Sequence, residues 1–278
     1  MKPNRNYKNS VFTTLFGEKE TLLELYNAIG NTNYGKDTPI QITTLENVLY
    51  MDRINDISFL IDEKIVVLIE HQSTINENMP FRMLEYITRV YEKIRNSSDS
   101  YDPKMFNLPA PEFIVLYNGK DEFPDHKTYK LSDMTKEFRG DKPIKLELIV
   151  EVYNINNGRN PEFTKKSETL SGYEIFIAEI RENEKTMNRE EAMKKAIEDC
   201  IKRNVLKNFL EANSTEVINM LLKEWDLEEA QRVWERSGRQ QGIQQGIQQG
   251  IQQGMQQLFD FLKKGHSLEE ANKKFAFR

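Results

Sequence analysis

The sequence predicts an α/β fold, with a mixed central sheet flanked by helices and followed by a helical C-terminal extension. Two observations predict it. Short apolar runs rich in β-branched residues alternate with longer segments of helical periodicity, which is the pattern of a sheet covered on both faces. From about residue 188 onward, a second region of long helical patterns follows.

The N-terminal part begins with a helix and a strand. Apolar residues from Leu22 to Ile29 recur with helical spacing, so a helix is predicted over residues 19–29. A strand is expected over residues 40–50. The runs Ile57–Ile61 and Ile65–Ile69 are separated by a short polar turn and predict a β-hairpin.

The following segment alternates helix and strand. A helix is predicted over residues 81–94, beginning after Pro80, which suits a first helical turn. Apolar runs predict strands over residues 112–117 and 146–153, and an amphipathic helix over 170–180. The segment 120–143 carries little regular signal.

Two acids lie at the open end of the hairpin, and the register of the hairpin decides whether they meet. A three-residue loop pairs Ile61 with Ile65 and places Asp56 directly opposite Glu70. A two-residue loop instead places Asp56 opposite Ile69, with the acids on opposite faces. A functional role for the pair therefore predicts the three-residue loop.

Two neighbouring carboxylates repel each other unless a cation lies between them, and their hard oxygen atoms suit magnesium or manganese. Gln72 follows Glu70 on the same face of the strand and could orient a water molecule. This spacing is that of a phosphodiesterase site. The alternative is that Asp56 merely ends a turn and Glu70 merely ends a strand, as acids often do.

The same residues carry a family resemblance. The stretch from Asp56 through EHQS (Glu70–Ser73) to MPFRMLEYITRVYEKI (Met79–Ile94) resembles the recombination-promoting nuclease/putative transposase family of the PD-(D/E)XK nuclease superfamily. The segments VFTTLFGEKETLLELYNAI (Val11–Ile29) and LYNG (Leu116–Gly119) match in the same order. The resemblance covers most of residues 11–181 and implies a restriction-endonuclease-like sheet.

The resemblance also implies roles for particular residues. Asp56 and Glu70 would be catalytic metal ligands, with the backbone carbonyl of His71 as a third. Gln72 takes the place of the superfamily's lysine, and Glu24 is the acid from the first helix, although a solvated helix face explains Glu24 equally well.

The implied activity is that of a metal-dependent DNA endonuclease. It would hydrolyse phosphodiester bonds with Mg²⁺, or with Mn²⁺ or Ca²⁺ in its place, in recombination or mobile-element biology. The alternative is a nuclease fold that binds DNA or a protein partner and no longer cuts.

Arg82, Arg89 and Lys93 are spaced i, i+7 and i+11, which places them on one face of their predicted helix and predicts a DNA-binding row. The alternative is an ordinary exposed face, on which Glu85 and Glu92 alternate in sign with them. A net charge of −5 argues against a protein that coats polyanions generally, so any contact with DNA must be local.

The composition argues against disulfide-bonded, zinc-binding and membrane proteins. The single cysteine, Cys200, rules out an intrachain disulfide, and three scattered histidines are too few for a zinc cluster. The sequence shows neither a signal-peptide pattern nor an apolar run long enough to cross a bilayer, so a cytoplasmic protein without membrane contact is expected.

The C-terminal region contains a strict four-residue repeat. Five glycines recur in it: Gly238, Gly242, Gly246, Gly250 and Gly254. Each glycine costs a helix about 1 kcal/mol relative to alanine. Two interpretations follow, a helix ordered by self-association into a homo-oligomer, and a flexible linker.

Three regions are therefore expected along the chain. They are a nuclease-like domain over residues 1–185, a helical region over 186–237, and the repeat with a terminal helix over 238–278. Within the helical region, a break is predicted at Asn213, with Ser214 capping the next helix.

Overall fold

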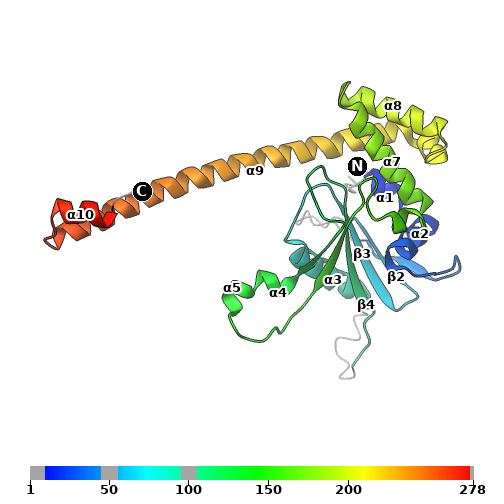
Figure 1. The fold of residues 1–278 in the computed structure, drawn as a ribbon. Coiled ribbons are helices and arrows are strands. Elements are labelled where there is room, and N and C mark those ends of the chain that lie inside the picture. Colours follow the sequence, from blue (N-terminus) through cyan, green and yellow to red (C-terminus); the bar gives the residue numbers. More distant parts are fainter. Residues whose placement is uncertain (1–9, 45–55, 95–104, 276–278) are drawn as a thin grey trace, which may run out of the picture. The chain divides into compact units, whose positions relative to one another are not determined.

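A computed structural model describes residues 10–44, 56–94 and 105–275 (Figure 1). The chain divides into two compact units, Met1–Glu224 and Trp225–Arg278. The first unit contains the sheet, so residues 186–224 group with it. The expected boundary at residue 185 does not coincide with this division, and the three-region organisation stays a prediction.

The described strands form one six-stranded sheet with the order β1-β2-β3-β4-β6-β5. The central strands β3, β4 and β6 run parallel, whereas β1, β2 and β5 join by antiparallel pairing. The strands are β1 (Ile40–Ile42), β2 (Ile57–Ile61), β3 (Ile65–Gln72), β4 (Ala110–Tyr117), β5 (His126–Lys130) and β6 (Ile149–Asn154). The predicted mixed sheet is confirmed.

Ten helices are assigned within the described residues. They are α1 (Val11–Leu15), α2 (Lys19–Gly30), α3 (Met79–Ile94), α4 (Leu131–Met134), α5 (Lys136–Arg139), α6 (Pro161–Thr164), α7 (Glu168–Asn183), α8 (Arg189–Lys202), α9 (Lys207–Lys263) and α10 (Leu268–Phe275). The helices predicted over 19–29, 81–94 and 170–180 correspond to α2, α3 and α7.

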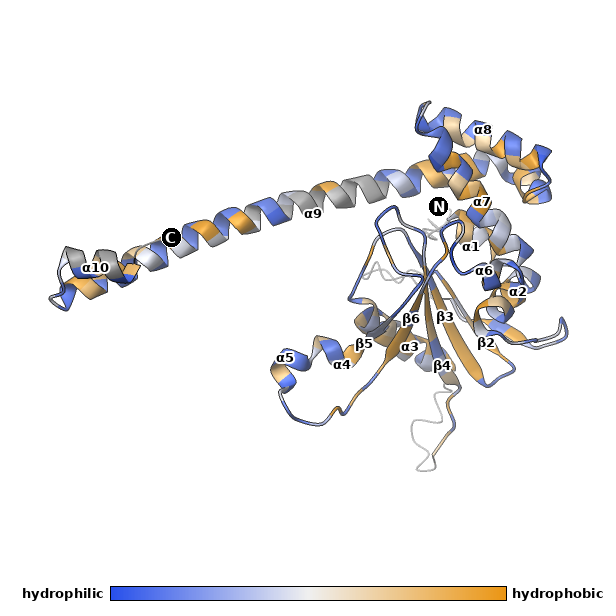
Figure 2. Ribbon diagram, in the orientation of Figure 1, coloured by the Kyte–Doolittle hydropathy of each residue, from blue (hydrophilic) through white to orange (hydrophobic). Residues whose placement is uncertain are grey.

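Helices cover both faces of the sheet, which explains why its central strands are continuously apolar (Figure 2). On one face, α3 packs its buried residues against alternate residues of β3, β4 and β6. On the other face, Phe12 of α1 stacks on His71 with ring centroids 4.7 Å apart, and Tyr26 of α2 packs edge-on against Phe59. The Tyr173 ring of α7 also packs against His71.

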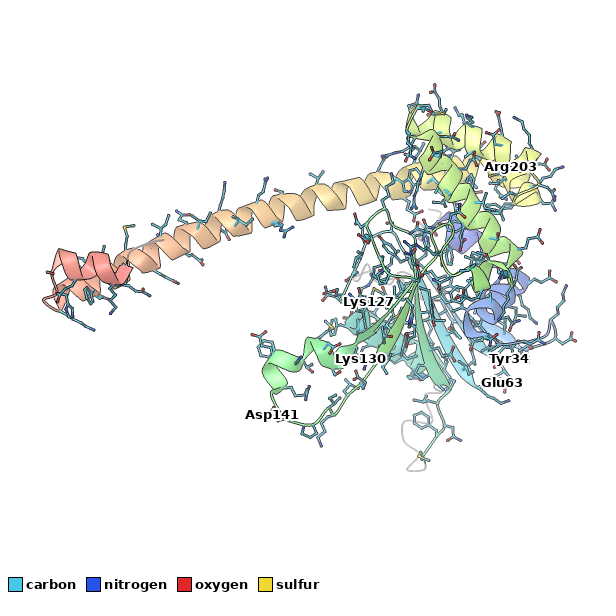
Figure 3. All side chains as sticks on the ribbon, viewed as in Figure 1. Tyr34, Glu63, Lys127, Lys130, Asp141 and Arg203 are labelled. Atoms are coloured by element: carbon cyan, nitrogen blue, oxygen red, sulfur yellow. The ribbon has the colours of Figure 1, made fainter. Side chains whose placement is uncertain are left out.

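The β2–β3 turn has the predicted three-residue length, because Ile61 pairs with Ile65 and Ile57 with Ile69. Asp62 and Glu63 both adopt left-handed backbone conformations, with φ of 50° and 55°. The Lys64 N–H donates to the Ile61 carbonyl at 3.0 Å and closes the turn. Glu63 is labelled at this turn, at the opposite end of β2 from Asp56 (Figure 3).

Several boundaries differ from expectation. β1 covers residues 40–42 of the strand expected over 40–50, whose residues 45–50 lie outside the described part of the chain. The segment 120–143 contains β5, α4 and α5, which sequence periodicity did not indicate. β6 begins at residue 149 rather than 146.

The predicted break at Asn213 is wrong, because α9 continues through it without interruption. The side-chain amide of Asn213 donates to the Phe209 carbonyl at 2.8 Å, one turn earlier. This bond satisfies the polar side chain inside the helix, and Ser214 is an internal residue rather than a cap.

The glycine repeat lies within α9 and is helical. Its large apolar side chains are more than half exposed: Ile243, Ile247, Ile251 and Met255. A Cβ added to Gly242, Gly246, Gly250 or Gly254 would meet no neighbouring atom within 4 Å. Assembly through the repeat stays a prediction. None of the helices described is both long and apolar enough to cross a membrane.

Candidate active site

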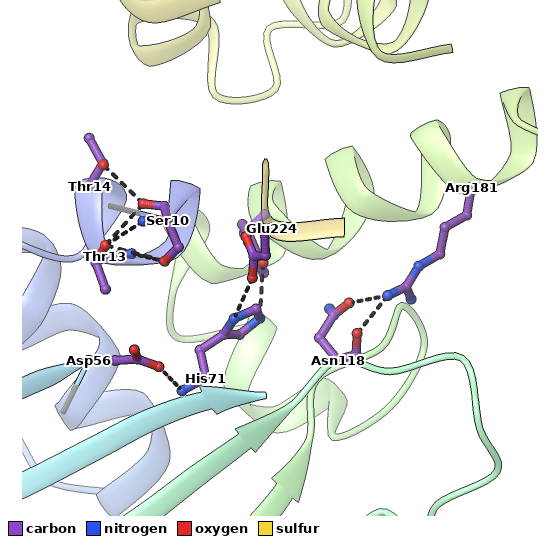
Figure 4. Close-up of polar contacts among 9 residues, drawn as sticks. Ser10, Thr13, Thr14, Asp56, His71, Asn118, Arg181 and Glu224 are labelled. Carbon is purple, nitrogen blue, oxygen red and sulfur yellow. Dashed lines mark hydrogen bonds and ion pairs between the residues drawn. The ribbon is translucent and has the colours of Figure 1, made fainter. Parts of the chain in front are cut away.

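The hairpin brings Asp56 and Glu70 into contact. Asp56 directly precedes β2, and the pairing of Ile57 with Ile69 places it opposite Glu70 of β3. The His71 N–H donates to Asp56 Oδ2 at 2.8 Å (Figure 4). The Asp56 N–H donates to Glu70 Oε1 at 3.1 Å. The three-residue loop therefore places Asp56 opposite Glu70, as the sequence predicts.

Both acids are buried, Glu70 completely and Asp56 to all but 6%. A buried carboxylate is costly unless an opposite charge or hydrogen bonds compensate it. Arg82 of α3 provides that charge, because its Nη2 donates to Glu70 Oε2 at 3.1 Å. The same nitrogen donates to the Tyr86 hydroxyl oxygen at 2.8 Å. Arg82 thus acts as the counter-ion of the acidic pair.

The surroundings of the acidic pair shift the pKa values of Arg82 and Tyr86. Burial acts to lower the pKa of Arg82, but the negative charge of Glu70 and the contact with Tyr86 outweigh it, so the Arg82 pKa lies above its ordinary value. Burial, followed by the charge of Glu70, raises the pKa of the Tyr86 hydroxyl. At neutral pH the pair is a charged guanidinium and a neutral phenol.

Gln72 lies beside this ion pair. Its Nε2 contacts Met79 Sδ at 2.8 Å, and Arg82 Nη1 approaches the same sulfur at 3.6 Å. The Gln72 carbonyl accepts from the Asn118 N–H at 2.8 Å, on the β4 side of the strand. Because backbone groups alternate sides along a strand, the His71 carbonyl points to the opposite side, where Asp56 lies. The predicted third ligand therefore lies on the side of β3 where Asp56 lies, and its role stays a prediction.

The His71 side chain lies on the other face of the sheet from Glu70. Its Nε2 is 3.0 Å from the Tyr173 hydroxyl, and its Nδ1 is 3.9 Å from Glu224 Oε1 (Figure 4). Since the ring also stacks on Phe12, the imidazole ties the end of β3 to α1, α7 and α9. These contacts of the His71 side chain are therefore structural, and the predicted role of its backbone carbonyl stays a prediction.

Glu24 lies elsewhere. Its two carboxylate oxygens accept from the Thr169 N–H at 3.0 Å and from the Thr169 hydroxyl at 3.1 Å, in the first turn of α7. This is a capping contact, which favours a negative charge at a helix N-terminus. Among the described residues, Glu24 has no hydrogen bond to Asp56 or Glu70. Its catalytic role stays a prediction that this contact does not support.

The predicted DNA-binding row begins at the site and runs away from it. Arg82 contacts Glu70, whereas Lys93 is exposed and its Nζ lies 3.3 Å from the Thr44 carbonyl. Arg89 is half-buried between them. The eleven residues from Arg82 to Lys93 span about 16 Å of helix. Binding of DNA by this row stays a prediction.

The donors at the hairpin fit a hard divalent cation. Two carboxylates and one backbone carbonyl are all oxygen ligands, and Mg²⁺ commonly takes one or two carboxylates while keeping several waters. No group of three or more His, Cys, Asp and Glu suited to a metal occurs within the part of the chain that the structure describes. The water molecules and the substrate would therefore complete the coordination.

The sequence did not indicate two of the contacts. Tyr86 contacts Arg82, and Met79 contacts Gln72, but the sequence predicts a role for neither Tyr86 nor Met79. The available signal is the spacing on α3, because Met79, Arg82 and Tyr86 are separated by three and four residues and share one face.

These features define a mixed α/β protein with a buried acidic pair at the open end of a sheet hairpin. The chain belongs to the YhgA-like putative transposase family, whose family model matches residues 56–204, more than half of the 278 residues. This match confirms the family resemblance found in the sequence. It begins at Asp56 and includes Glu70, Gln72 and Arg82. No curated protein and no solved structure matches the chain significantly.

Proposed function

We propose that the protein is a metal-dependent DNA endonuclease that hydrolyses phosphodiester bonds. The observation that carries the proposal is the arrangement of two buried acids at the open end of the hairpin, where the Asp56 N–H donates to the Glu70 carboxylate and the His71 N–H donates to the Asp56 carboxylate. Membership of a transposase family supports DNA as the substrate and recombination or mobile elements as the setting.

Asp56 and Glu70 would hold Mg²⁺, or Mn²⁺ or Ca²⁺ in its place, together with the His71 carbonyl. When bound, the metal supplies a Lewis acid for the scissile phosphate and lowers the pKa of a coordinated water. The protein's own contribution is to fix both carboxylates through backbone N–H groups, so their geometry does not depend on mobile side chains.

Arg82 supplies the positive charge that Gln72 lacks. A lysine at position 72 would face the scissile phosphate, whereas glutamine can only orient a water or donate a neutral hydrogen bond. The Arg82 guanidinium pairs with Glu70 and shares with Gln72 a contact to the Met79 sulfur, so a phosphate bound there would lie within its reach. Transfer of Arg82 from Glu70 to a phosphate oxygen would restore the missing charge.

Nicking of supercoiled plasmid tests the proposal. Asp56→Asn and Glu70→Gln keep the size of each side chain and remove its charge, and each should lower the Mg²⁺-dependent cleavage rate by roughly 100-fold or more. Glu63→Gln is the matched control, since it changes an acid at the far end of the same hairpin and should cut at the wild-type rate. Equal cutting by all three variants would exclude this site.

A second candidate is a DNA-binding module that does not cut. The contact between Arg82 and Glu70 favours it, because an internal cation already neutralises one of the two acids. This reading expects DNA binding in the presence of chelator and no product with any divalent metal, from protein shown to be folded.

A further inference from the structure

An open pocket of about 550 Å³ lies at the carboxyl ends of β4 and β6. Four cationic side chains line it, and they come from the segment after β4, the segment after β6, and the end of α7. The four are Lys120, Arg159, Arg181 and Lys185. Neither the acidic pair nor the predicted row on α3 uses any of them.

The pocket lies at the sheet edge that carries the acids. Because β3, β4 and β6 are parallel, their carboxyl ends share one edge, where open α/β sheets commonly bind ligands. The Asn118 N–H donates to the Gln72 carbonyl at 2.8 Å. A Cβ on Gly119 would come within 2.1 Å of the Ser73 carbonyl oxygen, so only glycine allows this approach. The pocket wall is thereby fixed against the strand end that bears Glu70 and Gln72.

Arg181 is held in place by neutral groups. Its Nη2 donates to the Asn118 carbonyl at 2.6 Å and to Asn118 Oδ1 at 2.8 Å (Figure 4). Its Nη1 donates to Asn156 Oδ1 at 2.7 Å. Asn118 is itself buried. These bonds orient the guanidinium at the wall of the pocket.

The other three cations form ion pairs at the rim of the pocket. The pairs are Lys120 with Glu184 at 3.2 Å, Arg159 with Asp125 at 2.8 Å and Lys185 with Glu182 at 2.5 Å. Asp121 and Glu122 also line the pocket. The pairs of Arg159 and Lys185 are largely exposed, and such pairs contribute little stability, so these two cations can exchange a carboxylate for a phosphate at low cost. Charge-assisted bonds to phosphate are the stronger contacts.

We propose that this phosphate pocket, lined by Lys120, Arg159, Arg181 and Lys185, binds a backbone phosphate of the DNA. This phosphate would be the neighbour, in the same strand, of the phosphate that lies at the acidic pair. The inference rests on the proposed function for its choice of DNA. It adds a second contact that holds the strand across the carboxyl ends of β3, β4 and β6.

The test is a DNA-binding titration of the full chain in chelator, where cleavage cannot interfere. Arg159→Gln/Lys185→Gln removes two exposed cations and spares Arg181, whose loss would also release Asn118. Lys194→Gln/Lys202→Gln is the matched control, because both lysines form exposed ion pairs on α8. Fluorescence anisotropy of a labelled duplex is followed from low to moderate salt.

The pocket variant should bind duplex about 10-fold more weakly, with a log–log salt dependence shallower by about one to two. The control should match the wild type. Equal affinity and equal salt slope for both double variants would overturn the proposal, as would an absence of duplex binding by the wild type at low salt.

Competition distinguishes the sources of phosphate. Inorganic phosphate and a mononucleotide should compete only weakly with duplex. Tight binding of either small molecule, lost in the pocket variant while duplex binding is unchanged, would assign the pocket to a small ligand and overturn its role with DNA. Reduced duplex binding by the variant, together with a wild type that never cuts, would uphold the pocket and reject the nuclease.

Discussion

The carboxylate of Glu70 has no solvent exposure, and Arg82 is the cation that neutralises it. Replacing Arg82 with methionine keeps the side-chain stem and removes the charge. The free energy of unfolding should fall by about 2 kcal/mol, less than for a fully buried pair because Arg82 is partly exposed. Urea unfolding measures this, and in a Glu70→Gln background the effect should shrink markedly. Equal losses in both backgrounds would rule out the ion pair as the cause.

Magnesium should offset part of that loss. A cation held by Asp56 and Glu70 replaces the charge that Arg82→Met removes, so Mg²⁺ should raise the melting temperature of this variant more than that of the wild type. Thermal unfolding with and without Mg²⁺ is the measurement, and Asp56→Asn/Arg82→Met is the control that should not respond.

Glu174 predicts a second residue-scale effect, on pH dependence. It is buried in α7, its Oε1 has no partner among the described residues, and burial raises its pKa to about 8. The folded state therefore binds a proton that the unfolded state releases above pH 4.5, and stability should fall as the pH rises from about 5 to 8.

Glu174→Gln should remove this loss. At pH 5 the variant and the wild type should be similar, and at pH 8.5 the variant should be more stable by roughly 3 kcal/mol. Urea unfolding at the two pH values provides the comparison. Parallel pH profiles for the two proteins would show that Glu174 does not titrate in this range.

The sequence could predict the acidic pair, because strand alternation and the loop length decide where Asp56 and Glu70 lie. It could not predict that Arg82 contacts Glu70, since that depends on how α3 packs over the sheet. For Glu24, the position in the chain's structure could be predicted but the contact could not. Its place on α2 was predicted correctly, but its partner Thr169 is 145 residues away in the sequence, and no local pattern reports such a contact.

At the scale of elements, strongly periodic segments were predicted well and weakly periodic ones were not. α2, α3 and α7 have clear apolar faces. β5 is an edge strand of five residues, HKTYK, in which only Tyr129 is buried, so it lacks the apolar run that reveals a central strand. The break predicted at Asn213 is wrong because a polar residue that favours caps also fits inside a helix when its side chain bonds to the preceding turn.

The repeat in α9 carries the element-scale prediction. Replacing Gly242, Gly246, Gly250 and Gly254 with alanine should increase helix stability by about 1 kcal/mol each, since the added methyl groups would meet no atom of the described residues beyond the nearby helix backbone. If the glycines admit a second copy of the helix, the same variant should lower the oligomeric mass. Circular dichroism and light scattering after size-exclusion chromatography report the two effects.

Ile243→Gln/Ile247→Gln/Ile251→Gln is the matched variant, because it removes the exposed apolar stripe and keeps every glycine. Association through the stripe should fail in this variant as well. A wild-type chain that is monomeric, or a mass unchanged by both sets of substitutions, would exclude assembly through the repeat and favour a spacer.

At the scale of the whole molecule, the compact unit that contains the sheet extends to Glu224, beyond the end of the family match at residue 204. The extension buries four apolar side chains of α9: Leu210, Val217, Met220 and Leu221. Burial of these four side chains stabilises the fold by about 6 kcal/mol or more, which is comparable to the free energy of unfolding of an entire domain.

A fragment ending at Glu224 should therefore unfold cooperatively, within about 5 °C of the full chain, whereas one ending at residue 204 should be largely unfolded. Circular dichroism during heating makes the comparison. A stable fragment of residues 1–204 would show that α9 is dispensable for the sheet.

The three-residue turn at Asp62–Lys64 has a consequence for how this hairpin tolerates change. Its side chains lie away from Asp56 and Glu70, so most amino-acid replacements in the turn should leave the acidic pair in place. Glu63→Gly should even be stabilising, because the φ of Glu63 is positive. Removing or adding a single codon is different. It would move Asp56 to the opposite face from Glu70 while leaving every residue of the acidic pair intact. A library of insertions and deletions should thus find an inactivating hotspot at a turn where a library of substitutions finds none.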